Sequence, residues 1–414
     1  MKRFLAQIVM PCLLMVSMAS AATRVAIVTT ETHPDLMAAI ELAETACSGE
    51  PGMELLDRRF IESALREQTA SLSGVLSASQ GVAIGKLLDA QVLMILQQPD
   101  PQKPADIVVF EAETGIRLAD GALPEEALSQ QAAFLKTLMD QALRKKNNTD
   151  HATRTLSLLA VQNVDLPRSQ DYFAQSIAYL VERNLIRSPA IALLERERLD
   201  ALNAERGLHG GRLENNLLPS VCIWELEVRR GAAEQEIRLF IRATDVEGKT
   251  LGEAVVLGPA HAADLAERLQ GELVRLLQLE APPKTTDRKA EARRFQREAE
   301  IQAQHKRMGP ALRAAEAALA LDPANTDAMA SLAEYRMAQA KAIPGTNGSM
   351  FASSALDLLF TLKAKHIKSK ADENLFYYLN WYPDLIELRS RYRSYLGIAD
   401  TPSGVQSADD RWLM

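Results

Sequence analysis

The sequence predicts an α/β fold, with two tandem small α/β domains that contain mixed sheets, followed by an all-α domain. Two successive segments of similar length alternate short apolar runs with amphipathic stretches, a pattern typical of strands and helices packed in layers. Both segments place these elements in the same order. After residue 286 the sequence becomes rich in Ala, Glu, Arg and Gln, which favours helix throughout. A length of 414 residues suits two or three domains.

The first segment, residues 22–148, opens with an apolar run from Arg24 to Val28 that predicts a buried strand. A helix follows, because apolar residues return every three or four positions after Pro34. Glu113-Thr114-Gly115 lies between two apolar runs and predicts a hairpin turn. We expect strands at residues 24–28, 53–59, 90–96, 106–112 and 116–119, and helices at residues 34–47, 60–68, 82–88 and 124–146.

The second segment, residues 152–280, repeats this order of elements. A polar stretch from Lys145 to Asp150 separates it from the first segment and predicts a linker. We expect strands at residues 155–161, 191–196, 221–228, 237–244 and 250–256, and helices at residues 169–184, 199–206 and 261–278. The shared order favours an internal duplication.

One short motif occurs in both segments. Each copy reads Leu-Leu-acid-Arg, with a Glu ten residues after the acid. The matched residues are Asp57, Arg58 and Glu67 in the first copy and Glu195, Arg196 and Glu205 in the second. In the structural interpretation, the acid lies at a helix N-terminus, where the dipole favours it, and the later Glu pairs with the Arg. The alternative is a ligand-binding pair; we favour the structural interpretation, because structural ion pairs produce the same pattern.

The third segment, residues 287–397, carries the spacing of packed helices. Ala299, Ala311 and Ala318 are small residues at helical spacing, and the turn sequence Asp322-Pro323-Ala324-Asn325 precedes a new helix for which Thr326 is the expected N-cap. Further helices are expected at residues 353–366 and 372–396. We expect the last residues, 398–414, to be a loose tail.

Aromatic residues gather near the end of this third segment. Phe376, Tyr378, Trp381 and Tyr382 form a possible interaction surface for an extended peptide or a glycan. The alternative is a core that compensates for an alanine-rich helical domain. The pattern favours the core and leaves both possibilities open.

The strand, Leu-Leu-acid-Arg turn and Glu-bearing helix resemble the curli-secretion (CsgG-type) periplasmic domain and the similar N-terminal domain of TolB. This resemblance covers residues 24–146 and 155–279, and it implies a periplasmic α/β module used for assembly and protein contact. The third segment resembles tetratricopeptide repeats over residues 292–342. The chain departs from the secretion channels: it lacks a lipidation signal, and we see short strands with charged residues on both faces, which argues against pore formation.

The first 21 residues have the three parts of a secretory signal peptide. Lys2 and Arg3 form a basic region, an apolar run extends from Phe4 to Met18, and Ala19-Ser20-Ala21 matches the cleavage pattern. We expect cleavage after Ala21 and a periplasmic or secreted protein. No small residue precedes Cys12, so we do not expect a lipoprotein.

Charge and cysteine content narrow the choice of partners. Without residues 1–21 the chain has 45 Lys and Arg against 54 Asp and Glu, a formal charge of −9. This acidic balance argues against nucleic acid as a partner and allows at most peripheral membrane contact. Cys47 and Cys222 lie in different predicted domains and belong to no CxxC motif, so we expect two separate buried thiols.

The function expected from these observations is that of a non-enzymatic envelope protein, a scaffold or an assembly and transport component. Gly81 to Leu87 is one residue too short for a phosphate-binding loop, and no GxSxG or HExxH pattern is present. We therefore expect no cofactor and no metal. The expected partners are other envelope proteins or extended peptides, and an oligomer is possible. The alternative is an envelope hydrolase or a glycan-binding protein that uses the aromatic cluster.

Overall fold

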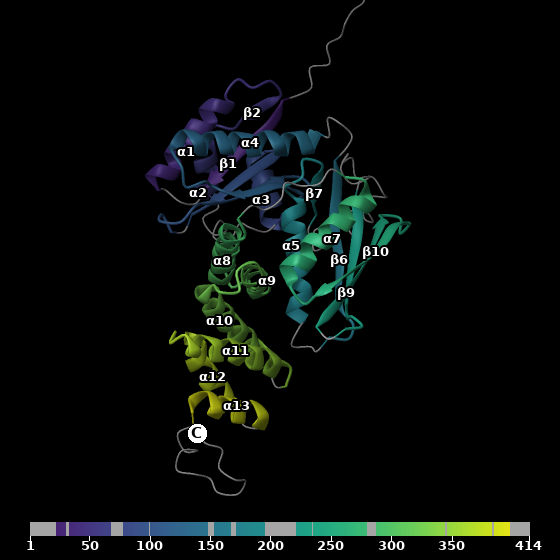
Figure 1. Cartoon of the computed structure of the whole chain (residues 1–414). Coiled ribbons are helices and arrows are strands. Elements are labelled where there is room, and N and C mark those ends of the chain that lie inside the picture. The colour runs from purple at the N-terminus through teal and green to yellow at the C-terminus, as the bar shows by residue number, and fades with distance from the viewer. Residues whose placement is uncertain are drawn as a thin grey trace, which may run out of the picture.

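Figure 1 shows the computed structural model of the chain. The structure describes residues 22–29, 33–67, 78–98, 100–147, 153–166, 171–194, 221–233, 235–279, 287–343, 346–382 and 385–397. Several expected features lie outside these residues. They are the signal peptide at 1–21, the helix at 199–206, the tail at 398–414, the second motif copy with Glu195, Arg196 and Glu205, and the side chain of Glu67.

Strands and helices follow one another through the first two segments, and the described residues after 287 contain helices alone, as the sequence predicts. The strand expected at residues 53–59 is shorter: it ends at Leu55, because Arg58 and Arg59 already belong to the next helix, which the Asp57 carboxylate caps. The strands are β1 (Thr23–Thr29), β2 (Met53–Leu55), β3 (Val92–Gln97), β4 (Asp106–Glu111), β5 (Arg117–Ala122), β6 (Arg154–Asn163), β7 (Ile191–Leu193), β8 (Val221–Arg230), β9 (Glu236–Asp245) and β10 (Thr250–Pro259). The helices before residue 287 are α1 (Pro34–Cys47), α2 (Arg58–Glu67), α3 (Ala78–Leu88), α4 (Leu128–Asn147), α5 (Asp171–Leu185) and α7 (Ala262–Leu277).

All ten strands belong to one mixed sheet with the order β10-β9-β8-β6-β7-β5-β4-β3-β1-β2. We call β1–β5 the first half and β6–β10 the second half of the sheet. In each half, a central strand pairs in parallel with its two neighbours, and two antiparallel strands follow on one side. The sequence predicts separate sheets. They are joined because β5 pairs with β7 in an antiparallel manner at Arg117 and Leu193.

This antiparallel pairing turns the second half over relative to the first. Helices α1 and α4 pack on one face of the first half, whereas α2, α3 and the later helix α8 pack on its other face. Because all strand directions reverse across the β5–β7 contact, α5 and α7 of the second half lie on the face that α8 occupies. Ala192 of β7 accordingly packs with the α1 and α4 core, and Leu193 packs with the α5 and α7 core.

Four strands of the second half, β6, β8, β9 and β10, are longer than the sequence led us to expect, whereas β7 ends at Leu193, short of the strand expected at residues 191–196. Strands β8, β9 and β10 each have ten residues. In β8 the side chains of Trp224, Leu226 and Val228 are buried, while Glu225 and Glu227 between them are half-buried on the other face. Alternation of this kind places one face of the sheet against helices.

The helices after residue 287 form a column that extends away from the sheet (Figure 1). They are α8 (Arg288–Gln304), α9 (Met308–Leu321), α10 (Thr326–Ala342), α11 (Thr346–Ala364), α12 (Lys370–Trp381) and α13 (Ile386–Leu396), and we call them the helical column. Ala299, Ala311 and Ala318 are fully buried where these helices meet. None of the described helices combines the length and apolar character that a membrane span requires.

Three predictions about this column are corrected. The N-cap of α10 is Asn325, whose side chain accepts a hydrogen bond from the Ala328 amide at 3.0 Å, because Asn caps better than the Thr326 that follows. Helix α11 begins at Thr346, seven residues before the expected start at Ser353. The helix expected at 372–396 is two helices, since the sequence between α12 and α13 contains Pro383, which cannot continue a helix.

Two further predictions concern single residues. Cys47 of α1 and Cys222 of β8 are both buried and unpaired, which confirms two separate thiols. Lys145, which the sequence assigns to a polar linker, is instead a fully buried residue of α4. Its Nζ donates hydrogen bonds to the carbonyl oxygens of Leu118 at 2.7 Å and Ile186 at 2.6 Å, which satisfies the buried amine.

Helix α3 packs so closely against the end of β4 that Gly85 has no room for a side chain. A Cβ at Gly85 would lie 2.2 Å from the Cβ of Ala112. We expect Gly85→Ala to lower the free energy of unfolding by about 1–3 kcal/mol, because the added methyl group forces the helix away from the strand.

The matched control is Gly271 of helix α7, whose added Cβ would meet nothing within 4 Å. Gly271→Ala is expected to raise the free energy of unfolding by up to about 1 kcal/mol, since Ala is the better helix former. Urea unfolding of both variants measures the difference. Equal effects of the two substitutions would contradict close packing at Gly85.

Candidate functional site

The aromatic cluster is divided between core and surface. Tyr378 is 2% exposed and packs with Tyr392 and Tyr395 in the core of the helical column. Trp381 is 81% exposed and Tyr377, one helical turn before it, is 58% exposed. Phe376 and Tyr382 are half-buried and pack against the same core. The core interpretation therefore holds for Tyr378, whereas the interaction surface stays a prediction that only the exposed Trp381 and its neighbours could fulfil.

The first copy of the repeated motif stabilises the start of α2. The Asp57 carboxylate accepts hydrogen bonds from the backbone amides of Arg59 at 2.8 Å and Phe60 at 3.3 Å, in the position expected for the acid. Arg58 pairs with Glu44 of α1, with an Nη2–Oε1 distance of 2.9 Å. Arg58 thus ties α2 to α1. The expected pairing of Arg58 with Glu67 is not tested, because the Glu67 side chain lies outside the described residues.

The strongest concentration of buried charge lies where β5, α5 and α8 meet, and the sequence did not indicate it. Asp120 of β5 has a fully buried side chain. Its carboxylate forms ion pairs with Arg183 of α5 and with Arg294 of α8, the latter at 3.0 Å, and lies 3.5 Å from Arg117 Nη1. We call this group the junction cluster; it joins the first half of the sheet, the second half and the helical column.

Arg183 extends the cluster toward the helical column. Its guanidinium also pairs with Glu298 of α8 and donates a hydrogen bond to the Tyr179 hydroxyl at 3.2 Å. The Tyr179 ring meets Phe295 of α8 edge-on, with ring centroids 5.3 Å apart. Hydrogen bonds, ion pairs and ring packing therefore all hold α8 against α5.

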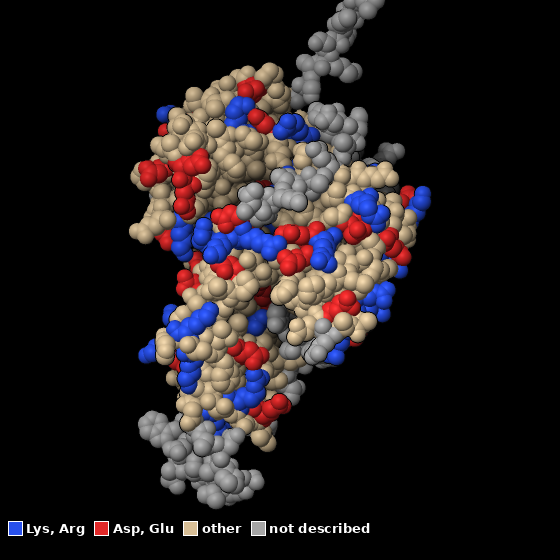
Figure 2. Space-filling view, in the orientation of Figure 1, with Lys and Arg blue, Asp and Glu red and all other residues tan. Residues whose placement is uncertain are grey.

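A second buried carboxylate, Asp106 of β4, lies beside this cluster with poorer partners. Its nearest cationic atoms are the Nε atoms of Arg294 and Arg297, both 3.9 Å from a carboxylate oxygen. Neither Asp106 oxygen accepts a hydrogen bond in the structure. Figure 2 shows that charged side chains of both signs form a band across this face of the molecule.

The two carboxylates titrate in opposite directions. Burial by itself raises the pKa of Asp120, but Arg294, Arg183 and Arg117 outweigh it and hold that pKa well below its usual range. For Asp106, burial outweighs Arg297 and Arg294 and raises the pKa to about 7. The difference follows from geometry, since contact with guanidinium groups stabilises the charged form and a 3.9 Å separation does so less.

Lys145 contributes a buried amine at the same boundary. Burial lowers the pKa of Lys145 to about 7, and the nearby Asp120 opposes this shift only in part. Among the described residues, no three His, Cys, Asp or Glu side chains gather as a metal site would require. The ion pairs of the junction cluster tie β5, α5 and α8 to one another.

A sequence signal for this cluster exists in retrospect. Arg183 is buried on the apolar side of α5, on which Tyr179 and Leu180 lie one turn earlier. Arg294 is buried beside Phe295 in α8. Charged residues on a face otherwise made of apolar residues are costly to bury without partners. The partners themselves lie in distant segments, which a single sequence does not connect.

Removal of the central carboxylate should weaken the fold strongly. We expect Asp120→Asn to lower the free energy of unfolding by about 3–5 kcal/mol, because Arg183 and Arg294 would remain buried with a neutral partner. Urea unfolding measures this loss.

The control for this substitution is Asp140→Asn. Asp140 forms a half-exposed pair with Lys136 at 3.0 Å, within a single helix near the surface, so its loss should cost less than about 1 kcal/mol. If both variants lost the same stability, the junction cluster would not hold the fold together.

The raised pKa of Asp106 predicts how the free energy of unfolding depends on pH. The folded protein binds a proton at Asp106 between the ordinary pKa of 3.8 and about 7, where the unfolded chain does not. The contribution of Asp106 to stability therefore falls as pH rises through this range. Asp106→Asn should become progressively more stable relative to the unchanged protein from pH 4 to pH 8, in thermal or urea unfolding. A constant difference across this range would contradict the raised pKa.

Comparison of the chain with protein families, with curated proteins and with solved structures gave no match. The resemblance to the curli-secretion and TolB domains therefore rests on the sequence pattern alone.

Proposed function

We propose that this protein is an exported, non-enzymatic scaffold of the cell envelope that acts through contacts with other proteins. In this proposal, the two halves of the sheet are tandem modules similar to the CsgG-type and TolB N-terminal domains. The helical column is a tetratricopeptide-like unit that presents a binding surface.

The repeated strand order supports the tandem modules. The first half runs β2-β1-β3-β4-β5 and the second half β7-β6-β8-β9-β10, so corresponding strands occupy corresponding places. Corresponding pairs also have the same parallel or antiparallel direction. A shared topology in consecutive segments is what duplication of one module produces.

The observation that carries the proposed function is the exposed aromatic pair on α12. Trp381 and Tyr377 lie four residues apart, so they share one face of the helix, and Ile386 at the start of α13 is 76% exposed. Large aromatic side chains are enriched at the centres of protein interfaces, where they supply much of the binding energy. We call Trp381 and Tyr377 the α12 patch.

The packing beneath the α12 patch supports a rigid presentation of it. Tyr378 of the same helix is buried in the core of the helical column. Its hydroxyl lies close to Gly348 of α11, since a Cβ added at Gly348 would be 2.6 Å from the hydroxyl oxygen. Glu316 of α9 and Arg336 of α10 form a buried pair at 3.6 Å, and Arg336 donates a hydrogen bond to the Ser354 carbonyl at 3.2 Å. A patch on such a support loses little conformational freedom when a partner binds.

The test is site-specific crosslinking in the producing cell. A photoreactive amino acid in place of Trp381 should crosslink to a discrete partner protein, and the crosslink should disappear when Tyr377→Ala is added. The control position is Phe60 of α2, which is 47% exposed but lies on the other end of the molecule. Crosslinks at Phe60 that match those at Trp381, or none at Trp381, would contradict the proposal.

Export is tested separately. The protein recovered from the envelope fraction should begin at Ala22, as N-terminal sequencing would show. Recovery of the chain from the cytoplasm with residues 1–21 intact would contradict export.

The alternative, a glycan-binding protein or hydrolase, is favoured by the same exposed Trp381. An aromatic ring with 81% of its surface exposed can stack on a sugar ring as well as on a peptide. Saturable binding of envelope glycan that is lost in Trp381→Ala, without any protein crosslink, would favour this alternative.

A further inference from the structure

We propose that the cavity beside the junction cluster binds a small molecule with one anionic head, such as a carboxylate, and an apolar body. This site is separate from the α12 patch and goes beyond the scaffold function.

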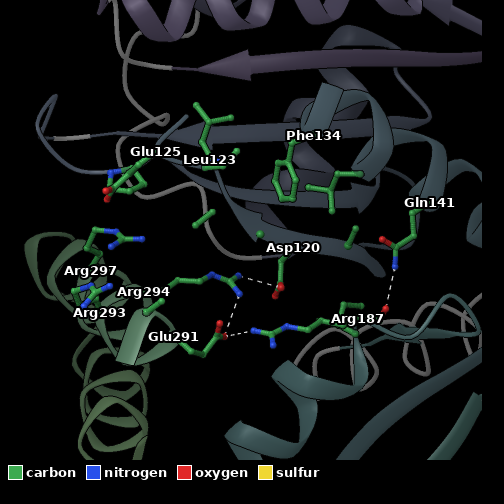
Figure 3. Close-up of a pocket in the computed structure, with 18 residues that line it drawn as sticks. Asp120, Leu123, Glu125, Phe134, Gln141, Arg187, Glu291, Arg293, Arg294 and Arg297 are labelled. Atoms are coloured by element: carbon green, nitrogen blue, oxygen red, sulfur yellow. Dashed lines mark hydrogen bonds and ion pairs between the residues drawn. The ribbon is translucent and has the colours of Figure 1, made fainter. Parts of the chain in front are cut away.

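The cavity has a volume of about 560 Å³ and lies between the sheet and the start of α8. This size falls within the range of roughly 300–1,000 Å³ that is typical of small-molecule sites. Leu123, which directly follows β5, and Phe134 and Leu138 of α4 form an apolar wall, as Figure 3 shows for the labelled Leu123 and Phe134. The facing wall is built from arginines of α8.

Two of these arginines are available for a ligand. Arg297 makes no hydrogen bond with the described residues, and its nearest carboxylate oxygen, on Asp106, is 3.9 Å from Nε. Arg293, four residues earlier on α8, is exposed, and the described part of the chain supplies it with no hydrogen-bonding partner. In Figure 3 both side chains lie on the same side of the cavity. A planar guanidinium with unused N–H groups is the preferred partner of a carboxylate.

The other two arginines of the cavity are already engaged. Arg294 pairs with Asp120 at 3.0 Å, and Arg187 pairs with Glu291 (Figure 3). The lining residues carry four arginines against three carboxylates, those of Asp120, Glu125 and Glu291. Asp106 does not line the cavity and lies 3.9 Å from Arg297 Nε, so the lining suits a head with a single negative charge, whereas its three carboxylates would repel a polyphosphate.

The apolar wall selects the body of the ligand. Phe134 lies against the backbone of β5, since a Cβ at Gly121 would be 3.0 Å from its ring. This contact holds the aromatic ring in place at the cavity wall. An alkyl or aryl group that covered Leu123, Phe134 and Leu138 would remove apolar surface from water, which is the main source of affinity for such a group.

The test uses octanoate as the probe, with 1-octanol as the counterpart that lacks the charged head and acetate as the counterpart that lacks the apolar tail. Isothermal titration calorimetry on the purified full chain should show saturable binding of octanoate, with weaker binding of both counterparts. Arg297→Gln and Arg293→Gln should each weaken octanoate binding about tenfold or more, because each substitution removes a charge-assisted hydrogen bond. Ala290→Trp, which places a large side chain at the exposed cavity edge on α8, should block binding without a change of charge.

The matched control is Lys289→Gln, which removes one positive charge from an exposed position on the same helix outside the cavity lining. It should leave octanoate affinity within twofold. The proposal is overturned if octanoate does not bind saturably, if 1-octanol or acetate binds as tightly, or if Lys289→Gln weakens binding as much as Arg297→Gln. Because no partner protein is present, failure here leaves the crosslinking result at Trp381 unaffected.

Discussion

The fully buried Asp120 carboxylate, held between Arg183 and Arg294, is the interaction on which the arrangement of this protein depends. Each of these charges would be costly to bury alone, so the three must stay together once the fold forms. They come from β5, α5 and α8, which belong to the first half of the sheet, the second half and the helical column. One ionic contact thus specifies how three parts of the chain are oriented.

This contact is possible only because the sheet reverses direction at β5 and β7. The antiparallel pairing at Arg117 and Leu193 brings α5 to the face of the sheet on which α8 packs. A parallel join would have placed α5 beside α4 on the opposite face, away from α8. The short pairing of β5 with β7 therefore has a large effect on the position of the helical column.

The cavity and the α12 patch follow from this arrangement in different ways. The cavity forms beside the junction cluster because α8 contacts the sheet through long arginine side chains, which leave space above Leu123 and Phe134. The α12 patch lies at the other end of the column (Figure 1), where apolar side chains of α12 and α13 remain exposed. If the protein has the proposed scaffold function, the helical column between them would set the distance from the sheet to a partner bound at the α12 patch.

The sequence by itself determined the order of strands and helices, though not all of their ends, because hydrophobic period, the Glu113-Thr114-Gly115 turn and prolines act over a few neighbouring residues. It also determined that Asp57 starts a helix and that the two thiols stay apart. Tertiary structure alone decided that one sheet forms instead of two, that Lys145 is buried, and that Tyr378 and Trp381 face opposite environments. The physical reason is distance along the chain: Asp120 and Arg183 are 63 residues apart, and only packing brings such partners together.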